Sequence, residues 1–197
     1  MTPNINIFVI FFASIFTSNI VLSNFLGLCS FISISKDIKA SNGLGLAVTF
    51  VLTITTAICF VINKYILIPF ELEYLQYIVF IIIIAGTVQI LEMIIDRISS
   101  SLYMVLGIFL PLITVNCAIL GVILFMVIRS YSFIQSVFFS IGSGLGWWIA
   151  IMLLAAIRKK IEKSPVIGPL KGTGITLIII GIMAMAFMGF SGLLNIQ

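Results

Sequence analysis

Long apolar runs alternate with short polar connections along the whole chain. Six apolar runs of about 20 residues are separated by charged or turn-forming residues, which is the pattern of transmembrane helices. We predict spans at Ile5–Asn24, Leu44–Ile62, Leu75–Ile95, Leu102–Ile128, Phe133–Ile157 and Gly174–Leu194. The pattern therefore predicts an all-α polytopic membrane protein with six transmembrane helices.

Two of the apolar stretches are longer than a bilayer requires. No charged residue occurs from Met1 to Ser35 or from Ile98 to Ile128. A continuous helix of about 31 residues would be roughly 46 Å long, against a hydrocarbon core of about 30 Å. We therefore expect the first and fourth spans to be broken at membrane depth. Broken backbone is tolerated there only where protein buries it or where it lines a cavity, so the two breaks are the candidate functional site.

Composition also indicates a membrane protein. Hydrophobic residues make up 62% of the 197 positions and charged residues 8%, and the mean hydropathy is +1.35. We found no low-complexity stretch or long linker, so we expect residues 1–197 to form a single integral membrane domain. The N-terminus lacks the basic segment of a signal peptide, and we interpret it as part of the first span.

Basic residues are unevenly distributed between the two sides of the predicted membrane. The loops after spans one, three and five hold eight of the ten basic residues, and the opposite side has only Lys64 and Arg129. Because short cytoplasmic loops are enriched in Lys and Arg, both termini are predicted to be periplasmic in a bacterial inner membrane. The net charge of +4 then reflects loops beside anionic lipid and does not indicate nucleic acid binding. The eight residues are Lys36, Lys39, Arg97, Arg158, Lys159, Lys160, Lys163 and Lys171.

The two halves of the chain, about residues 1–97 and 98–197, follow one pattern. Each half begins with an overlong uncharged run that carries a cysteine, continues with a glycine-rich helix entry and ends with another apolar span. Three spans per half would place the second half upside down relative to the first. The chain is therefore predicted to contain two inverted three-helix repeats, an architecture of many transport proteins.

Cysteines are the candidate chemical groups. Cys29 and Cys117 occupy matching places in the two overlong runs, whereas Cys59 lies in an ordinary apolar span and is interpreted as a packing residue. Inversion would bring Cys29 and Cys117 to a common depth. A thiolate in hydrocarbon is costly unless a metal holds it, so the matched pair indicates metal ligands.

Two thiolates make half of a metal site. Tetrahedral sulfur sites for zinc or an iron–sulfur cluster ordinarily need four ligands, and the chain contains no histidine. The missing pair is therefore expected from another polypeptide. A disulfide between Cys29 and Cys117 is the competing explanation, although it would leave the polar, broken backbone beside them unexplained.

Four segments resemble a known protein family, and Pro111–Cys117 is the most specific part of the resemblance. The segments are LSNFLGLC at 22–29, QILEM at 89–93, LGIFLPLITVNCA at 106–118 and MAFMGFSG at 185–192. In them the chain resembles the NqrDE/RnfAE family, the small membrane subunits of Na+-translocating NADH:quinone oxidoreductase and of the Rnf complex. The resemblance extends from about residue 10 to the C-terminal end.

This resemblance implies one subunit of a six-subunit translocase, not an enzyme that is catalytic alone. It implies that NADH and flavins bind to other subunits and that the partner is a homologous inverted, NqrD-like membrane subunit. Two cysteines from each of the two chains would hold a 2Fe–2S cluster at mid-membrane. Cys29 and Cys117 match these ligand positions, and Cys59 matches none. Electrons from NADH would cross the bilayer to a quinone in this way, with coupled Na+ transport.

Other features leave alternatives open. Glu92 and Asp96 lie one helical turn apart, and an intramembrane carboxylate is a functional candidate, whereas Asp96 capping beside Arg97 at the interface is the structural alternative. We found no nucleotide-binding motif and no Ser/His/Asp set. Six spans with inverted repeats also fit a small permease, and a third interpretation is an anchor for other subunits. A permease should have a polar substrate pocket at the break, where only Ser, Thr and Asn accompany the cysteines.

Overall fold

Helices joined by turns make up the part of the chain that the computed structural model describes, residues 6–98, 113–114, 116–162 and 172–189. This part contains seven α-helices and no strand, so the prediction of an all-α protein is confirmed. A π-helical turn at Asn63–Leu67 and a 3-10 turn at Glu73–Leu75 connect α3 to α4. The α-helices are α1 (Ile7–Ile15), α2 (Leu28–Ile34), α3 (Ile38–Ile62), α4 (Gln76–Ile98), α7 (Cys117–Ile128), α8 (Phe133–Ile161) and α9 (Thr173–Met188).

Three helical segments are long and apolar enough to cross a bilayer: Ile38–Leu67, Gln76–Ile94 and Phe133–Ile161. They coincide with the second, third and fifth predicted spans. The shorter apolar helix α7 lies within the fourth predicted span, and α9 overlaps the sixth. Residues 102–112, 115 and 190–194 of these two spans are outside the described part of the chain. Within the first predicted span, only α1 is helical. The chain is a polytopic membrane protein, and its six-span inverted layout stays a prediction.

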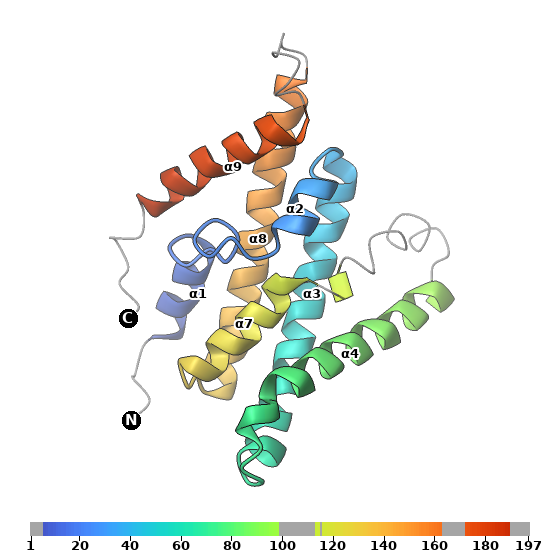
Figure 1. The fold of residues 1–197 in the computed structure, drawn as a ribbon, viewed down its shortest axis with the longest axis vertical. Coiled ribbons are helices and arrows are strands. Elements are labelled where there is room, and N and C mark those ends of the chain that lie inside the picture. Colours follow the sequence, from blue (N-terminus) through green and yellow to red (C-terminus); the bar gives the residue numbers. More distant parts are fainter. Residues whose placement is uncertain (1–5, 99–112, 115, 163–171, 190–197) are drawn as a thin grey trace.

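At the centre of the molecule, α3 and α8 pack side by side and run in opposite directions (Figure 1). Glycines of α8 allow neighbouring backbone to come close. A Cβ atom added to Gly144 would lie 2.8 Å from the Cα atom of Thr49 on α3. A Cβ atom on Gly146 would lie 2.8 Å from the carbonyl oxygen of Ile15, where α1 ends. Small residues of this kind allow membrane helices to pack tightly.

Side-chain caps fix where the two central helices begin. The carboxylate of Asp37 accepts a hydrogen bond from the backbone N–H of Lys39 at the start of α3, at 3.1 Å. Ser132 and Gln135 form a capping box at the start of α8. Both devices satisfy backbone N–H groups that the first helical turn leaves unpaired. The cap at Asp37 starts α3 six residues before its predicted span, whereas α8 begins at the predicted residue, Phe133, and continues to Ile161.

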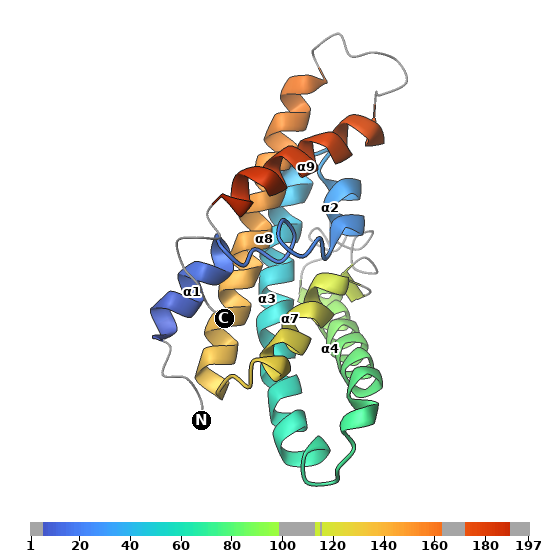
Figure 2. The ribbon, with the colours of Figure 1, turned by 60° about the vertical axis from the view of Figure 1, so that its left-hand side comes forward.

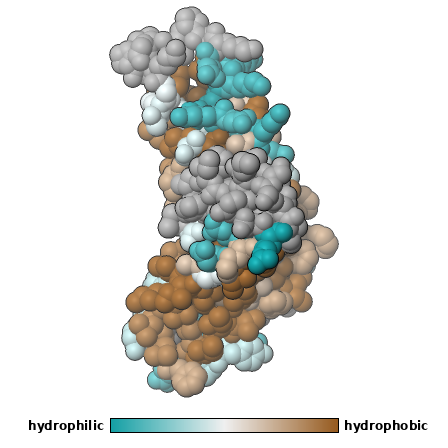
Figure 3. Space-filling view, turned by 90° about the vertical axis from the view of Figure 1, so that its right-hand side faces the viewer, coloured by the Kyte–Doolittle hydropathy of each residue, from teal (hydrophilic) through white to brown (hydrophobic). Residues whose placement is uncertain are grey.

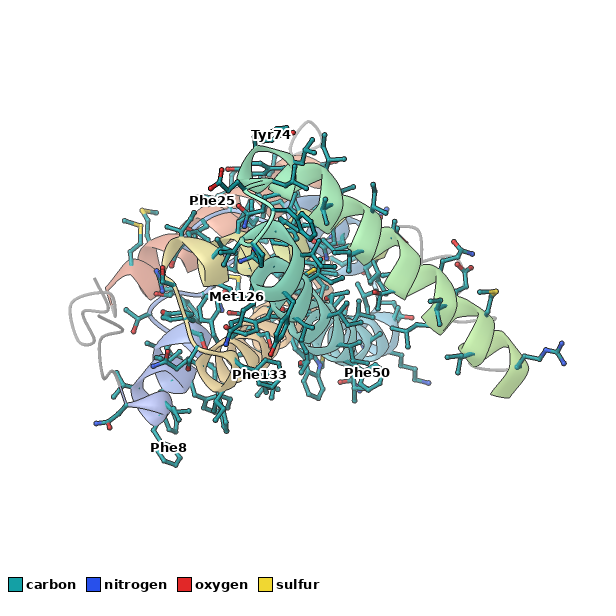
Figure 4. The ribbon with its side chains drawn as sticks, turned by 90° about the horizontal axis from the view of Figure 1, so that it is seen from below. Phe8, Phe25, Phe50, Tyr74, Met126 and Phe133 are labelled. Carbon is teal, nitrogen blue, oxygen red and sulfur yellow. The ribbon has the colours of Figure 1, made fainter. Side chains whose placement is uncertain are left out.

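The remaining helices surround this central pair. α1 packs on α8, α7 contacts α3, α4 and α8, and α9 lies across α8 (Figure 2). From one end of α3, α4 diverges from the bundle, and its side chains project freely on both sides (Figure 4). In the same view, the exposed rings of Phe8 and Phe50 point away from the bundle, whereas Met126 lies buried inside it.

On its outer surface the molecule carries a large hydrophobic area. Figure 3 shows this area over the lower half of the face that carries α4, with most hydrophilic residues toward the upper end. The exposed side chains of α4 include Ile78, Ile81, Ile82 and Ile90. An outer surface of this composition suits contact with lipid or with other membrane helices.

Candidate functional site

Within the first overlong run, α1 ends at Ile15 and α2 begins at Leu28, so the predicted break is present. The buried side chain of Asn19 organises the backbone between them. Its amide nitrogen donates to the carbonyl oxygens of Ile15 at 3.1 Å and of Gly146 on α8 at 2.9 Å. Its amide oxygen accepts from the backbone N–H groups of Val21 and Leu22. Asn19 thereby satisfies backbone groups that the break releases from helical pairing.

A left-handed glycine ends the first break. Gly27 is the N-cap residue of α2 and has a φ angle of +84°, a conformation that favours glycine. A Cβ atom at this position would lie 3.0 Å from the Cβ atom of Ala118, the side-chain oxygen of Asn116 and Nε1 of Trp147. Both the backbone conformation and the surrounding space therefore require glycine here. Its small size allows the first break to touch the second.

The second break ends at Asn116, where α7 begins. The side-chain oxygen of Asn116 accepts from the backbone N–H of Ala118 at 3.0 Å and so caps α7. The side-chain nitrogen of Asn116 donates to the hydroxyl of Ser30 on α2 at 3.4 Å. That hydroxyl in turn donates to the carbonyl oxygen of Gly27 at 3.1 Å. One buried asparagine thus links the starts of the two helices that carry the predicted ligands.

The structure brings Cys29 and Cys117 to the same place in the fold. The backbone N–H of Gly27, two residues before Cys29, donates to the sulfur of Cys117 at 2.9 Å. Both thiols are free and exposed, so the two cysteines form no disulfide in this structure. Cys59 is also free but lies fully buried in α3, as expected of a packing residue. The sequence predicted that Cys59 differs from Cys29 and Cys117, and in the structure Cys59 is buried whereas the other two are exposed.

Two backbone features lie beside the sulfur of Cys117. Cys117 is the first residue of the twelve-residue helix α7, so it lies at the positive end of the helix dipole. The N–H of Gly27 adds a direct hydrogen bond to the sulfur. Hydrogen bonds of this kind to ligand sulfurs help to set the reduction potential of iron–sulfur clusters.

The donor set fits half of a four-thiolate site. Among the described residues, no three His, Cys, Asp or Glu side chains are placed to share a metal ion. Cys29 and Cys117 are exposed in the single chain, so ligands from a second chain can reach them. The chemistry of Cys29 and Cys117 therefore fits a metal group shared between two chains, and the described residues alone do not complete such a site.

Several residues at the site carried no chemical signal in the sequence. Trp147 on α8 is fully buried and packs against Phe31 of α2, with ring centroids 6.2 Å apart. Its indole nitrogen and the hydroxyl of Ser143, one turn away, are buried without a hydrogen-bond partner among the described residues. Trp147 thus faces neighbouring helices. Asn19 was visible only as a residue that breaks a helix, and its bond to Gly146 joins positions far apart in the chain.

Glu92, one of the two carboxylates named from the sequence, takes part in none of the site contacts described above. Glu92 lies half-buried on α4. The side chain of Asp96 is outside the described part of the structure, so the proposed interfacial capping role is untested. Pro111 and Val115 of the second overlong run are outside it as well.

A polytopic helical membrane protein with two cysteine-bearing helix breaks packed against each other is the class that the fold and site define. Residues 7–194 match the family described as Rnf-Nqr subunit, membrane protein. The chain belongs to this family, and the resemblance seen in the sequence is confirmed.

Curated relatives of two kinds are similar to the chain. The E subunit of the Na(+)-translocating NADH-quinone reductase of Chlamydia trachomatis serovar L2 is 47% identical over 201 residues, which cover 96% of this chain and 82% of the relative. The corresponding protein of Chlamydia caviae is 45% identical and covers 96% and 76% of the two chains. The A subunit of the Na(+)-translocating ferredoxin:NAD(+) oxidoreductase complex of Acetobacterium woodii is 49% identical over 184 residues, covering 93% of this chain and 96% of the relative.

Proposed function

We propose that the chain is a membrane subunit of a Na+-translocating NADH:quinone oxidoreductase and relays electrons across the bilayer with coupled Na+ transport. The observation that carries the proposal is the hydrogen bond from Gly27 to the sulfur of Cys117, because it joins the two cysteine-bearing breaks into one site. The relatives named above are subunits of ion-translocating redox complexes, which supports the same class of function.

In this proposal, Cys29 and Cys117 are two ligands of a 2Fe–2S cluster shared with a homologous, inverted NqrD-like subunit. When bound, such a cluster accepts and donates one electron at a time. The chain's own residues would provide two thiolates, the N–H of Gly27 and the N-terminus of α7 to stabilise negative charge at the sulfurs. Asn116 would keep the two cysteine-bearing helices at a fixed separation through Ser30. NADH, flavins and the quinone would bind to other subunits.

Inverted repeats would suit this role. A site near the axis between two inverted halves lies at a common depth from both membrane surfaces, which divides the distance that an electron must cross. In the described part of the chain, α2, α3 and α4 are followed in the same order by α7, α8 and α9, and α3 and α8 pack against each other. This order of a short cysteine-bearing helix, a long helix and a further apolar helix supports the proposed repeat.

Serine substitutions in the assembled complex test the proposed function. We expect Cys29→Ser or Cys117→Ser to abolish the iron–sulfur signal and quinone reduction by NADH, because a hydroxyl does not readily replace a thiolate on iron. NADH oxidation by a soluble artificial acceptor should continue, since that step precedes the membrane relay. Iron content, electron paramagnetic resonance of the reduced complex and the two activities are the measurements.

Cys59→Ser is the matched control, because Cys59 is buried in α3 away from the breaks. It should retain the cluster and both activities and cost about 1 kcal/mol of stability at most. If Cys29→Ser and Cys59→Ser both retain full quinone reduction and unchanged iron content, the shared-cluster proposal is wrong.

A second candidate is the role of the A subunit in a ferredoxin:NAD+ oxidoreductase, favoured by the relative from Acetobacterium woodii. The segment Gly142–Trp147 and the residues Val115–Cys117 favour the E subunit of the quinone reductase, because we expect threonine at position 115 in the Rnf protein. The two candidates assign the same cysteines. They differ in the electron donor and acceptor of the purified complex, which are NADH and a quinone in one case and ferredoxin and NAD+ in the other.

A further inference from the structure

The helix that carries Cys29 is too short to hold its own position. α2 spans only Leu28–Ile34, about two turns, and isolated helices of this length are unstable in water. Its start is linked to the second break through Ser30 and Asn116. Its far end must be fixed separately, because the last carbonyl groups of a helix have no partner within the helix.

Arg158 on α8 contacts this far end. Its Nη1 atom donates to the carbonyl oxygen of Ile32 at 2.8 Å and to the hydroxyl of Ser35 at 2.5 Å. Ser35 is the C-cap residue of α2, so the guanidinium group lies where the helix dipole is negative. The next two residues of α8, Lys159 and Lys160, are exposed. Arg158 therefore differs from the other basic residues of this helix end in being turned inward onto α2.

The same long helix holds α2 at a second point. Trp147, three turns before Arg158, packs against Phe31 and lies beside Gly27. α8 thus contacts α2 near its middle through an aromatic ring and at its end through a charged donor. Because α8 is one of the two central helices, it provides a rigid support for the short one.

We propose that Arg158 is a positioning residue that fixes α2, and thereby Cys29, against α8. The role of α2 as a ligand-bearing helix rests on the function proposed above, whereas the attachment of α2 to α8 does not. Charge-assisted hydrogen bonds to a helix end are among the stronger single interactions in proteins. Loss of Arg158 should therefore loosen α2 without removing any residue from the ligand set.

Hydrogen–deuterium exchange in the assembled complex tests the attachment directly. In Arg158→Met, we expect the backbone amides of residues 28–36 to exchange about tenfold faster, since a hydrogen bond to a charged group contributes on that scale. Ser35→Ala removes one acceptor of Arg158 together with the hydrogen bond from the Ser35 hydroxyl to the carbonyl oxygen of Ile32, and it leaves the bond from Arg158 to Ile32 in place. It should raise exchange less, which keeps the test open if Arg158→Met does not assemble. Arg158→Lys should restore part of the protection. Lys159→Met, which removes an exposed charge from the same helix end, should leave exchange in 28–36 unchanged.

Electron paramagnetic resonance of the same variants tests the consequence for Cys29. We expect Arg158→Met to broaden the cluster signal or shift its midpoint potential, with Lys159→Met unchanged. Unaltered exchange in both Arg158→Met and Ser35→Ala would overturn the proposal, as would faster exchange with an unchanged cluster signal. If even the unsubstituted complex has no iron–sulfur signal, the proposed function fails, and the exchange data alone decide whether Arg158 fixes α2.

Discussion

At the scale of single residues, the site depends on backbone geometry as much as on the cysteines. Gly27 has a left-handed backbone conformation and donates its N–H to the sulfur of Cys117. A Cβ atom added to Gly27 would lie 3.0 Å from each of three neighbouring groups. Asn116 and Asn19 each use both ends of one amide to bind backbone or side chains across a break. The interactions of the two asparagines involve no charged group, which is how broken backbone can be paired in a medium without water.

Gly27→Ala tests this geometry. An alanine in the left-handed region costs about 1–2 kcal/mol, and its methyl group would push the backbone away from Ala118 and Asn116. We expect the hydrogen bond to Cys117 to weaken and the midpoint potential of the proposed cluster to become more negative, because the reduced cluster loses a donor that stabilises its charge. A redox titration followed by electron paramagnetic resonance measures the potential.

Gly43→Ala is the matched control for this substitution. Gly43 has an ordinary helical conformation on α3, and a Cβ atom there would meet nothing within 4 Å. The midpoint potential of the proposed cluster in Gly43→Ala should equal that in the unsubstituted complex. An unchanged potential in Gly27→Ala, with the cluster present, would show that the N–H of Gly27 does not influence the sulfur.

At the scale of elements, the long helices could be predicted from the sequence, but the contact between the two cysteine-bearing segments could not. The apolar runs at 44–62, 75–95 and 133–157 became α3, α4 and α8 with modest changes at their ends, because hydrophobic length alone requires a span there. Excess length and polar residues also predicted the interruptions between α1 and α2 and before α7, and their location at membrane depth stays a prediction. The contacts of Gly27 with Cys117 and of Arg158 with Ile32 depend on how separate elements pack in three dimensions. Apolar patterning contains no information about such contacts, so Arg158 was interpreted only as a loop charge.

Gly146→Val tests how closely α1 and the first break pack on α8. A Cβ atom at Gly146 would lie 2.8 Å from the carbonyl oxygen of Ile15 and 3.0 Å from the amide nitrogen of Asn19, so the backbone itself must move. Overpacking of this kind typically costs about 1–3 kcal/mol. We expect a lower thermal unfolding temperature of the complex in detergent and a weaker bond between Asn19 and Gly146.

The control for Gly146→Val is Gly181→Val on α9, where a Cβ atom would meet nothing within 4 Å. It should leave the unfolding temperature nearly unchanged. Equal unfolding temperatures for both variants would mean that α1 and α8 tolerate a wider separation than the structure indicates.

At the scale of the whole molecule, charged residues gather at opposite ends of the central pair. Ser35, next to Lys36, is bonded to Arg158, so the turn before α3 and the last turn of α8 share one end. At the other end, the rings of Phe60 and Phe133 lie 5.4 Å apart, close in sequence to Lys64 and Arg129. The basic residues beside the start of α3 and those in the last turn of α8, which the sequence assigned to one side of the membrane, are therefore at one end of the fold.

This arrangement leads to a prediction of orientation. Eight basic residues on one side against two on the other predict that the end of the fold near Arg158 is cytoplasmic and that both termini are periplasmic. We expect alkaline phosphatase fused after Gln197 to be active and a fluorescent reporter fused there to be dark, with the reverse for fusions at Lys160. Lys64, on the opposite side, provides an internal control and should behave like Gln197. A cytoplasmic Gln197 together with a periplasmic Lys160 would reverse the orientation, and an inverted partner would then have to run the other way as well. Fusions at Lys64 and Lys160 that report the same side would contradict the placement of these residues at opposite ends of α3 and α8.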